Sequence, residues 1–481
     1  MKKNNSGTLV NLFWKFSERI SAQLVTLIVS IVLARILEPS HYGTIAIVNI
    51  FITLANVFVA DGFGSALIQK KDADALDFSS VLYFNVAFSV VLYLILFFAA
   101  PFIAAFYGEG YEVLTPVLRV LGIRLIVTGA NSIQHAYVSK KMIFKKFFYA
   151  TLTGTVISGV VGIGMAYAGY GVWALVGQYL TGTIVNTAVL ALSLKKVPIL
   201  AFSLKRVLGL LKFGSRILGS GLLIMGYQEL RALIIGKVYS SSDLAFFDKG
   251  KQFPSLIVTN INTSIGAVLF PKMAKEQDNI DKIKNTARTS IRFSSFLMCP
   301  IMLGFFAVSK PFVSIVLTDK WLPCVPLLQW FCIVYLFQPI HTANMQAIKA
   351  LGRSDIYLRL EIIKKTIELV VLVLVMNISV NMIVISTALL TVLFTFINAF
   401  PNKTLIRYTY KEQLSDILPN VLRAGIMAAV VMAMQVLPVA KLPLMIIQII
   451  TGGLLYLVLC KVTKCKELEL VFNMLKKKFV K

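Results

Sequence analysis

Apolar runs of about 20 residues recur from one end of this chain to the other, and that is the length an α-helix needs to cross a bilayer. Charged residues, prolines and glycines separate the runs, and no stretch between them is long enough for a soluble domain. The composition agrees, because 57% of the residues are hydrophobic and 15% are charged. The sequence therefore predicts an all-α integral membrane protein.

The runs predict about fourteen transmembrane helices. Their ranges are 18–36, 43–67, 80–106, 116–138, 149–168, 172–194, 213–236, 244–269, 292–316, 325–348, 357–376, 381–400, 421–438 and 444–460. The connections on one side of the membrane carry 34 Lys and Arg residues, and those on the other side carry five. By the positive-inside rule, this asymmetry predicts a multi-pass protein with both termini in the cytoplasm.

The net charge of +26 could suggest a nucleic-acid partner, but the basic residues lie in short clusters between apolar runs. Orientation in the membrane explains them better, and no nucleic acid is expected. The five cysteines form no CxxC pair and have no histidine at ligand spacing, so neither a metal nor a cofactor is predicted. The first apolar run has no small-residue cleavage site, and we expect it to be retained as a helix.

An internal repeat divides the sequence. An offset of 202 residues aligns 31–37 with 233–239 and 64–67 with 266–269 without gaps. Six helices per copy would relate the halves by an axis along the membrane normal, with a substrate site between them near the midplane. We therefore expect two pseudo-symmetric six-helix bundles, 1–200 and 201–412, and a third segment, 413–481, with two more helices and a basic tail.

Four stretches resemble motifs of the Wzx-type polysaccharide flippases, in the superfamily of the multidrug MATE antiporters. They are 33–43 (LARILEPSHYG), 61–69 (DGFGSALIQ), 233–237 with 246–249 (LIIGK and FFDK), and 338–339 with 350–355 (QP and ALGRSD). The resemblance implies a MATE-like, non-enzymatic transporter of the bacterial cytoplasmic (inner) membrane. It also implies transfer of undecaprenyl-diphosphate-linked oligosaccharide repeat units from the cytoplasmic to the outer leaflet, for capsule, O-antigen or exopolysaccharide synthesis.

Charged residues inside the predicted spans are the candidates for a functional site, because a charge in the membrane normally faces a protein interior or a watered cavity. Arg124, Arg231, Lys249 and Lys251 are the candidate cationic lining for a diphosphate head group. Ion pairs between helices and snorkelling to the membrane surface are the alternatives. Residues 249 and 251 lie about 200° apart on a regular helix, so we expect one of them to be the ligand. The resemblance favours Lys249, because the family's second-half motif carries a cation at that position.

Coupling to a proton or sodium ion requires a group that can bind one, which points to buried carboxylates. Asp61, Asp248 and Glu229 are the candidates.

Three other functions stay open. A MATE-like antiporter of cationic solutes should favour acidic rather than cationic lining. A prenyl-phosphate sugar transferase has support only from Asp72, Asp74 and Asp77, which could hold magnesium or simply form a solvated loop. A scaffold for polysaccharide-assembly proteins could use the basic tail at 476–478.

Overall fold

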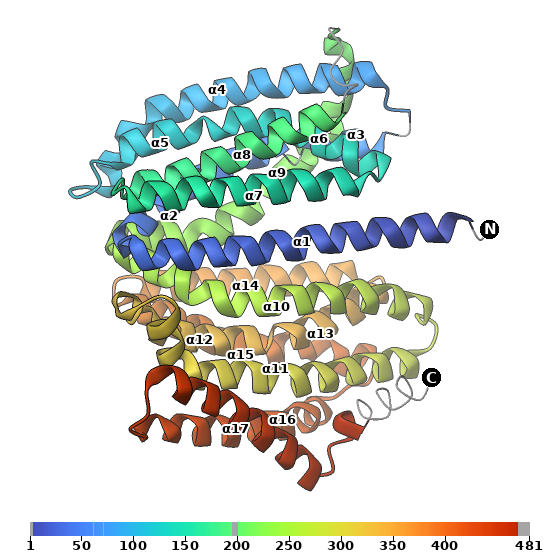
Figure 1. Ribbon diagram of the computed structural model, residues 1–481. Helices are drawn as coiled ribbons and strands as arrows, with labels where there is room; N and C mark the ends of the chain where they lie inside the picture. Colours follow the sequence, from blue (N-terminus) through green and yellow to red (C-terminus); the bar gives the residue numbers. More distant parts are fainter. Residues whose placement is uncertain (1–2, 61, 71, 195–200, 470–481) are drawn as a thin grey trace. The chain divides into compact units, whose positions relative to one another are not determined.

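The computed structural model describes residues 3–60, 62–70, 72–194 and 201–469, and these form an all-helical protein (Figure 1). The predicted all-α membrane fold is confirmed. The chain divides into two compact units, Met1–Ala245 and Phe246–Lys481. Each is described by itself below, and the boundaries predicted at 200 and 412 stay predictions.

The first unit contains nine helices within its described residues. They are α1 (Lys3–Ile36), α2 (Pro39–Ala60), α3 (Gly62–Gln69), α4 (Ala75–Tyr107), α5 (Leu114–Gly122), α6 (Arg124–Lys141), α7 (Phe144–Tyr167), α8 (Val172–Leu194) and α9 (Leu204–Val238). Helix α7 packs along α8 and α1, α6 lies between α4 and α8, and α9 packs on α2, α3 and α4.

The second unit begins within α10, and its described residues form eight α-helices and two short 3-10 turns. They are α10 (Ser241–Lys275), α11 (Ile280–Val316), η1 (Asp319–Trp321), α12 (Cys324–Leu336), α13 (Gln338–Ala350), α14 (Ser354–Val375), α15 (Val380–Leu405), α16 (Tyr410–Ala433), η2 (Met434–Val436) and α17 (Lys441–Val462). Helix α11 is central, because α12, α13, α16 and α17 all pack against it.

Twelve helical segments of the described chain are long and apolar enough to cross a membrane. Helices α9 and α14 are not among them, and both carry charged side chains along their length. The exact count of fourteen therefore stays a prediction. Two predicted spans are divided in the structure, into α5 and α6 and into α12 and α13. The last break precedes Pro339, which cannot donate a backbone hydrogen bond and so favours the start of a new helix.

Small residues allow α7 and α8 to approach closely. A Cβ atom added at Gly154 would lie 3.1 Å from the carbonyl oxygen of Gly182, and one added at Gly162 would lie 2.9 Å from Cβ of Gln178. Membrane helices use such residues at their interfaces because lipid gives little hydrophobic drive for association, and close packing must supply it. The glycines of this interface therefore hold α7 against α8.

Ion pairs hold α11 and α16 together. The Arg288 guanidinium donates to both carboxylate oxygens of Asp416, at 2.7 and 3.0 Å, and Lys284 Nζ lies 2.7 Å from Glu412. Tyr408, buried just before α16, donates to the same Asp416 carboxylate at 2.9 Å, and burial raises the pKa of its hydroxyl. Bidentate Arg–carboxylate pairs are the stronger kind of ion pair, so this contact fixes the position of α16 along α11.

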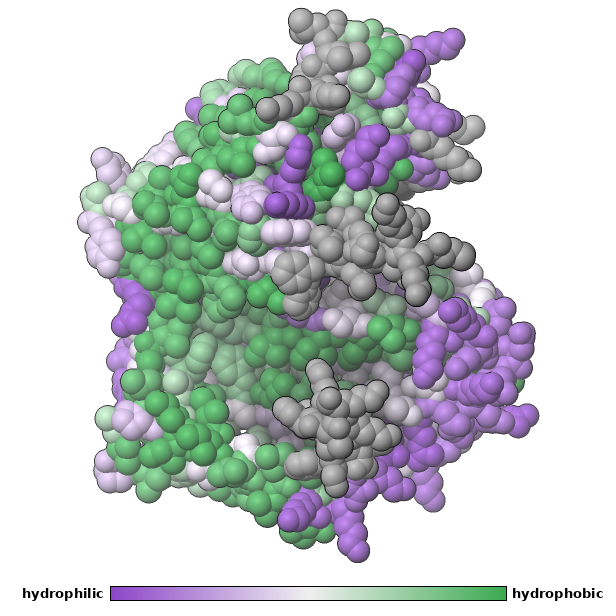
Figure 2. Space-filling model, turned by 45° about the vertical axis from the view of Figure 1, so that its right-hand side comes forward, coloured by the Kyte–Doolittle hydropathy of each residue, from purple (hydrophilic) through white to green (hydrophobic). Residues whose placement is uncertain are grey.

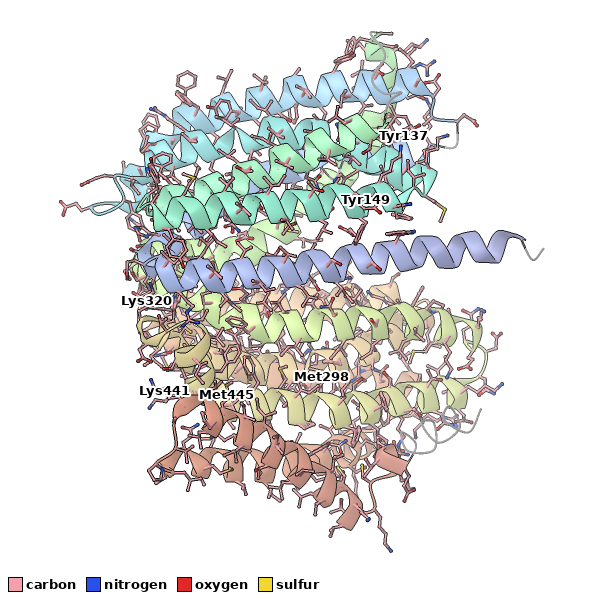
Figure 3. All side chains as sticks on the ribbon, viewed as in Figure 1. Tyr137, Tyr149, Met298, Lys320, Lys441 and Met445 are labelled. Carbon is pink, nitrogen blue, oxygen red and sulfur yellow. The ribbon has the colours of Figure 1, made fainter. Side chains whose placement is uncertain are left out.

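Charged side chains lie at the ends of the helices. In the second unit Lys320 and Lys441, both predicted on the outer side, lie at the same end of the helices (Figure 3). Lys441 pairs there with Asp319, whose pKa is held low mainly by the Ser314 hydroxyl and then by Lys441. Hydrophobic side chains cover much of the surface between the helix ends, and hydrophilic ones gather at the edges (Figure 2).

Candidate functional site

Arg124 is the candidate cation placed deepest in the first unit. It opens α6 at the break after α5, ten residues into the candidate span Leu114–Lys141, or about 15 Å along it. Its Nε atom donates to the Thr183 hydroxyl of α8 at 3.1 Å, and its guanidinium lies 5.5 Å from the centre of the Tyr179 ring. Within the described residues Arg124 has no carboxylate partner, so no described acidic side chain neutralises its charge.

A polar stripe continues from Arg124 along the same face of α6. Asn131 lies seven residues further, two helical turns on, and donates to the Asn186 side chain of α8 at 3.2 Å. Asn186 in turn donates to the Thr151 hydroxyl of α7 at 3.4 Å. The interior of the first unit therefore combines a cation with carboxamides and hydroxyls, which are groups that bind phosphate and sugar oxygens.

Thr183, Asn131 and Asn186 were not predicted from the sequence, because only charged residues within the spans were candidates. A detectable signal was present: Arg124 and Asn131 are polar residues at a seven-residue spacing on one helix, which places them on one face. Their partners on α8 carry no comparable signal, since the pairing of α6 with α8 is a tertiary contact.

Glu229 and Arg231 are half-buried on α9 in the same unit. The ion pair between them that was considered from sequence stays a prediction. Asp61, the third candidate for ion coupling, lies outside the described residues.

Lys249 is buried inside the second unit, with 5% of its surface exposed. Its Nζ atom donates to Gln252 at 3.1 Å and lies 5.8 Å from the centre of the buried Trp321 ring. Helix α10 is continuous here, and Gly250 packs closely on α12, where an added Cβ would meet Leu327 at 3.0 Å.

Lys251 and Asp248 are exposed on the other side of α10. Because the helix has no irregularity at Gly250, Lys249 and Lys251 occupy different faces. One α10 lysine therefore belongs to the interior of the unit and the other to its surface. Which of them contacts a substrate stays a prediction.

The acidic residues considered for magnesium are engaged in the structure. Asp74 caps the N-terminus of α4, accepting from the backbone N–H of Asp77, and this bond and Arg206 hold the pKa of Asp74 low. Asp77 is fully buried and lies 2.6 Å from Lys70 and 3.1 Å from Arg206. Among the described residues, no group of three or more His, Cys, Asp or Glu is arranged to hold a metal.

Solved transporters share this fold. The lipid II flippase MurJ in an inward closed conformation superposes with a TM-score of 0.74 at 17% identity, covering 94% of this chain and 98% of that one. An inward-facing MATE multidrug resistance transporter of the MOP superfamily gives a TM-score of 0.60 at 14% identity, covering 80% and 96%. At these identities the likeness concerns the fold.

Three relatives match over much of their length. The lipopolysaccharide biosynthesis protein WzxC of Escherichia coli K12 is 24% identical over 339 residues, covering 69% of this chain and 68% of the relative. The teichuronic acid biosynthesis protein TuaB of Bacillus subtilis 168 is 26% identical, covering 63% and 62%. The succinoglycan biosynthesis transport protein ExoT of Rhizobium meliloti 1021 is 22% identical, covering 62% and 60%. The chain thus spans under two thirds of the last two relatives.

The family model described as polysaccharide biosynthesis protein matches residues 32–326, which is more than half of the sequence. That region includes Arg124, Arg231, Lys249 and Lys251, so the candidate cations lie within the part that defines the family. The chain belongs to the polysaccharide biosynthesis protein family.

Proposed function

We propose that this protein is a flippase that moves undecaprenyl-diphosphate-linked oligosaccharide repeat units from the cytoplasmic to the outer leaflet of the bacterial inner membrane. Membership of the polysaccharide biosynthesis family supports this, as do a fold shared with a lipid II flippase and relatives named for lipopolysaccharide, teichuronic acid and succinoglycan synthesis. Alternating access of the two halves would carry the head group across, as in other transporters built from repeats.

The observation that carries this proposal is the environment of Arg124. This guanidinium lies well inside a membrane span and has no carboxylate partner in the described chain. Burying such an unpaired charge costs free energy unless an anionic ligand binds there and offsets it. Its carboxamide and hydroxyl neighbours suit a head group that carries sugars as well as phosphate. The same positive charge would disfavour the binding of a cationic solute, as a MATE-like antiporter of such solutes would require. We propose a non-enzymatic role, which requires no catalytic group at this site.

We also propose residues for ion coupling, the orientation of the termini and the remaining cations of the site. Asp248 and Glu229 are the described candidates for coupling to a proton or sodium ion, with Asp61 as a third. Both termini lie in the cytoplasm, where polysaccharide-assembly proteins could meet the protein. Arg231 and one of the two α10 lysines, Lys249 or Lys251, which lie on different faces of that helix, complete the proposed cationic lining.

The test uses a strain that depends on this protein for surface polysaccharide. We expect Arg124→Gln to reduce export about tenfold and to leave lipid-linked repeat units on the cytoplasmic side, while Arg124→Lys retains part of the activity. Arg119→Gln is the matched control, because Arg119 lies five residues away on α5 and donates to the carbonyl of Phe97. Protein abundance is measured for each variant. Normal export by an abundant Arg124→Gln protein would contradict the anion-binding role.

A further inference from the structure

A groove opens between α10 and α11 of the second unit, near the turn that joins them. Its volume is about 530 Å³, within the range of about 300–1,000 Å³ that is usual for small-molecule sites. Its lining residues are Ser264, Ile265, Val268, Leu269 and Lys272 on α10, and Asn285, Thr286, Thr289, Ser290 and Phe293 on α11. Both helices are candidate membrane spans, so the groove lies where the protein leaves the membrane.

The α11 wall of the groove is polar and available for binding. Asn285, Thr289 and Ser290 make no side-chain hydrogen bond within the described part of the chain, whereas Thr286 donates to Glu276 at 3.2 Å. Three neighbouring side chains with free donors and acceptors can bind a ligand rich in hydroxyl groups. A hydrocarbon chain would leave these groups unsatisfied.

Apolar residues also line the groove. Val268 of α10 is 67% exposed and Phe293 of α11 is 40% exposed. Burying such surface against a hydrocarbon chain is favourable by about 25 cal/mol per Å². The groove therefore presents apolar surface beside its polar wall.

Lys272 supplies the charge of the groove. It lies one turn before the end of α10, is exposed, and forms no ion pair within the described residues. No other charged side chain among the described residues lines the groove, so their net charge is positive. A phosphate group near Lys272 would complement this charge.

We propose that the groove binds a phosphate-linked glycolipid at the membrane surface, before the lipid reaches the interior of the transporter. The phosphate contacts Lys272, the first sugars contact Asn285, Thr289 and Ser290, and the hydrocarbon chain follows Val268 and Phe293. The proposal rests on the proposed function and adds to it a first docking site, on the side of the membrane that the basic α10–α11 turn marks as cytoplasmic.

Binding is tested on the full-length protein in detergent by native mass spectrometry. The probes are an undecaprenyl-diphosphate-linked disaccharide, undecaprenyl diphosphate and phosphatidylglycerol. We expect the glycolipid to bind most tightly, and Lys272→Glu or Thr289→Trp to weaken it about tenfold. Lys282→Glu and Phe270→Trp are matched controls, since both residues are exposed in the same region and neither lines the groove.

Two results would overturn the docking site. One is equal binding of phosphatidylglycerol and the glycolipid, which would indicate an ordinary lipid contact; the other is undiminished binding by both groove variants. Export is measured in parallel. Normal export by the groove variants with unchanged binding rejects the groove and leaves the proposed function standing. Failure of the wild-type protein to restore export, with glycolipid binding retained, rejects the proposed function and not the groove.

Discussion

At the residue scale, Asp77 shows how a carboxylate that resembles a metal ligand in sequence has a structural role in the fold. Its side chain is fully buried between Lys70 and Arg206, and it completes the capping box of α4 with Asp74. Removing one member of a buried ion pair leaves the remaining charge without the attraction that offsets its desolvation. Asp72, two residues before Asp74, is exposed and has no such contacts within the described chain.

We predict that Asp77→Asn lowers the free energy of unfolding by about 1–3 kcal/mol and lowers the thermal midpoint in detergent. Asp72→Asn should stay within about 0.5 kcal/mol of the wild type. Added magnesium should change neither protein. Unchanged stability of Asp77→Asn, with export lost and then restored by magnesium, would instead favour a metal-dependent transferase.

At the element scale, each unit uses ion pairs near a helix start to hold a later helix in place. Arg206 of α9 contacts Asp74 and Asp77 at the start of α4. In the second unit the signs are reversed, because Arg288 of α11 supplies the cation and Asp416 of α16 the carboxylate. Close packing at glycines also holds helices together within the membrane spans, as on the face of α7 that meets α8.

Two glycines of α7 give a matched test of that packing. A Cβ atom at Gly162 would lie 2.9 Å from Cβ of Gln178, whereas one at Gly164 would meet nothing within 4 Å. We predict that Gly162→Ala destabilises the protein by about 1–3 kcal/mol, because the helices must move apart. Gly164→Ala should be neutral or stabilising by up to about 1 kcal/mol, from better helix propensity. Thermal unfolding in detergent measures both, and equal midpoints would show that α7 and α8 separate without cost.

At the scale of the whole molecule, the charge asymmetry and the length of α10 together predict the membrane topology. Its 35 residues extend about 52 Å, which is more than the thickness of a bilayer. Ser240, just before α10, and Lys282, in the first turn of α11 after it, are both exposed. They should therefore lie on opposite sides of the membrane.

We predict that Ser240→Cys reacts with an impermeant thiol reagent in intact cells and that Lys282→Cys reacts only after permeabilisation. The background must lack the five native cysteines, all of which are buried. Labelling at both positions in intact cells would refute the topology, and the reverse pattern would invert it.

The sequence by itself determined the membrane class, most helix positions and the family, because span length, hydropathy and short motifs are local properties of the chain. It also located the charged candidates Arg124 and Lys249. The tertiary structure decided what surrounds them: Thr183 and Tyr179 beside Arg124, and Gln252 and Trp321 beside Lys249.

The groove between α10 and α11 was likewise absent from the sequence prediction, as was the burial of Asp77. Both depend on which faces of distant helices meet, and helical periodicity specifies a face without specifying its partner. Side-chain contacts between segments far apart in the chain therefore required the folded structure, whereas the existence of the helices did not.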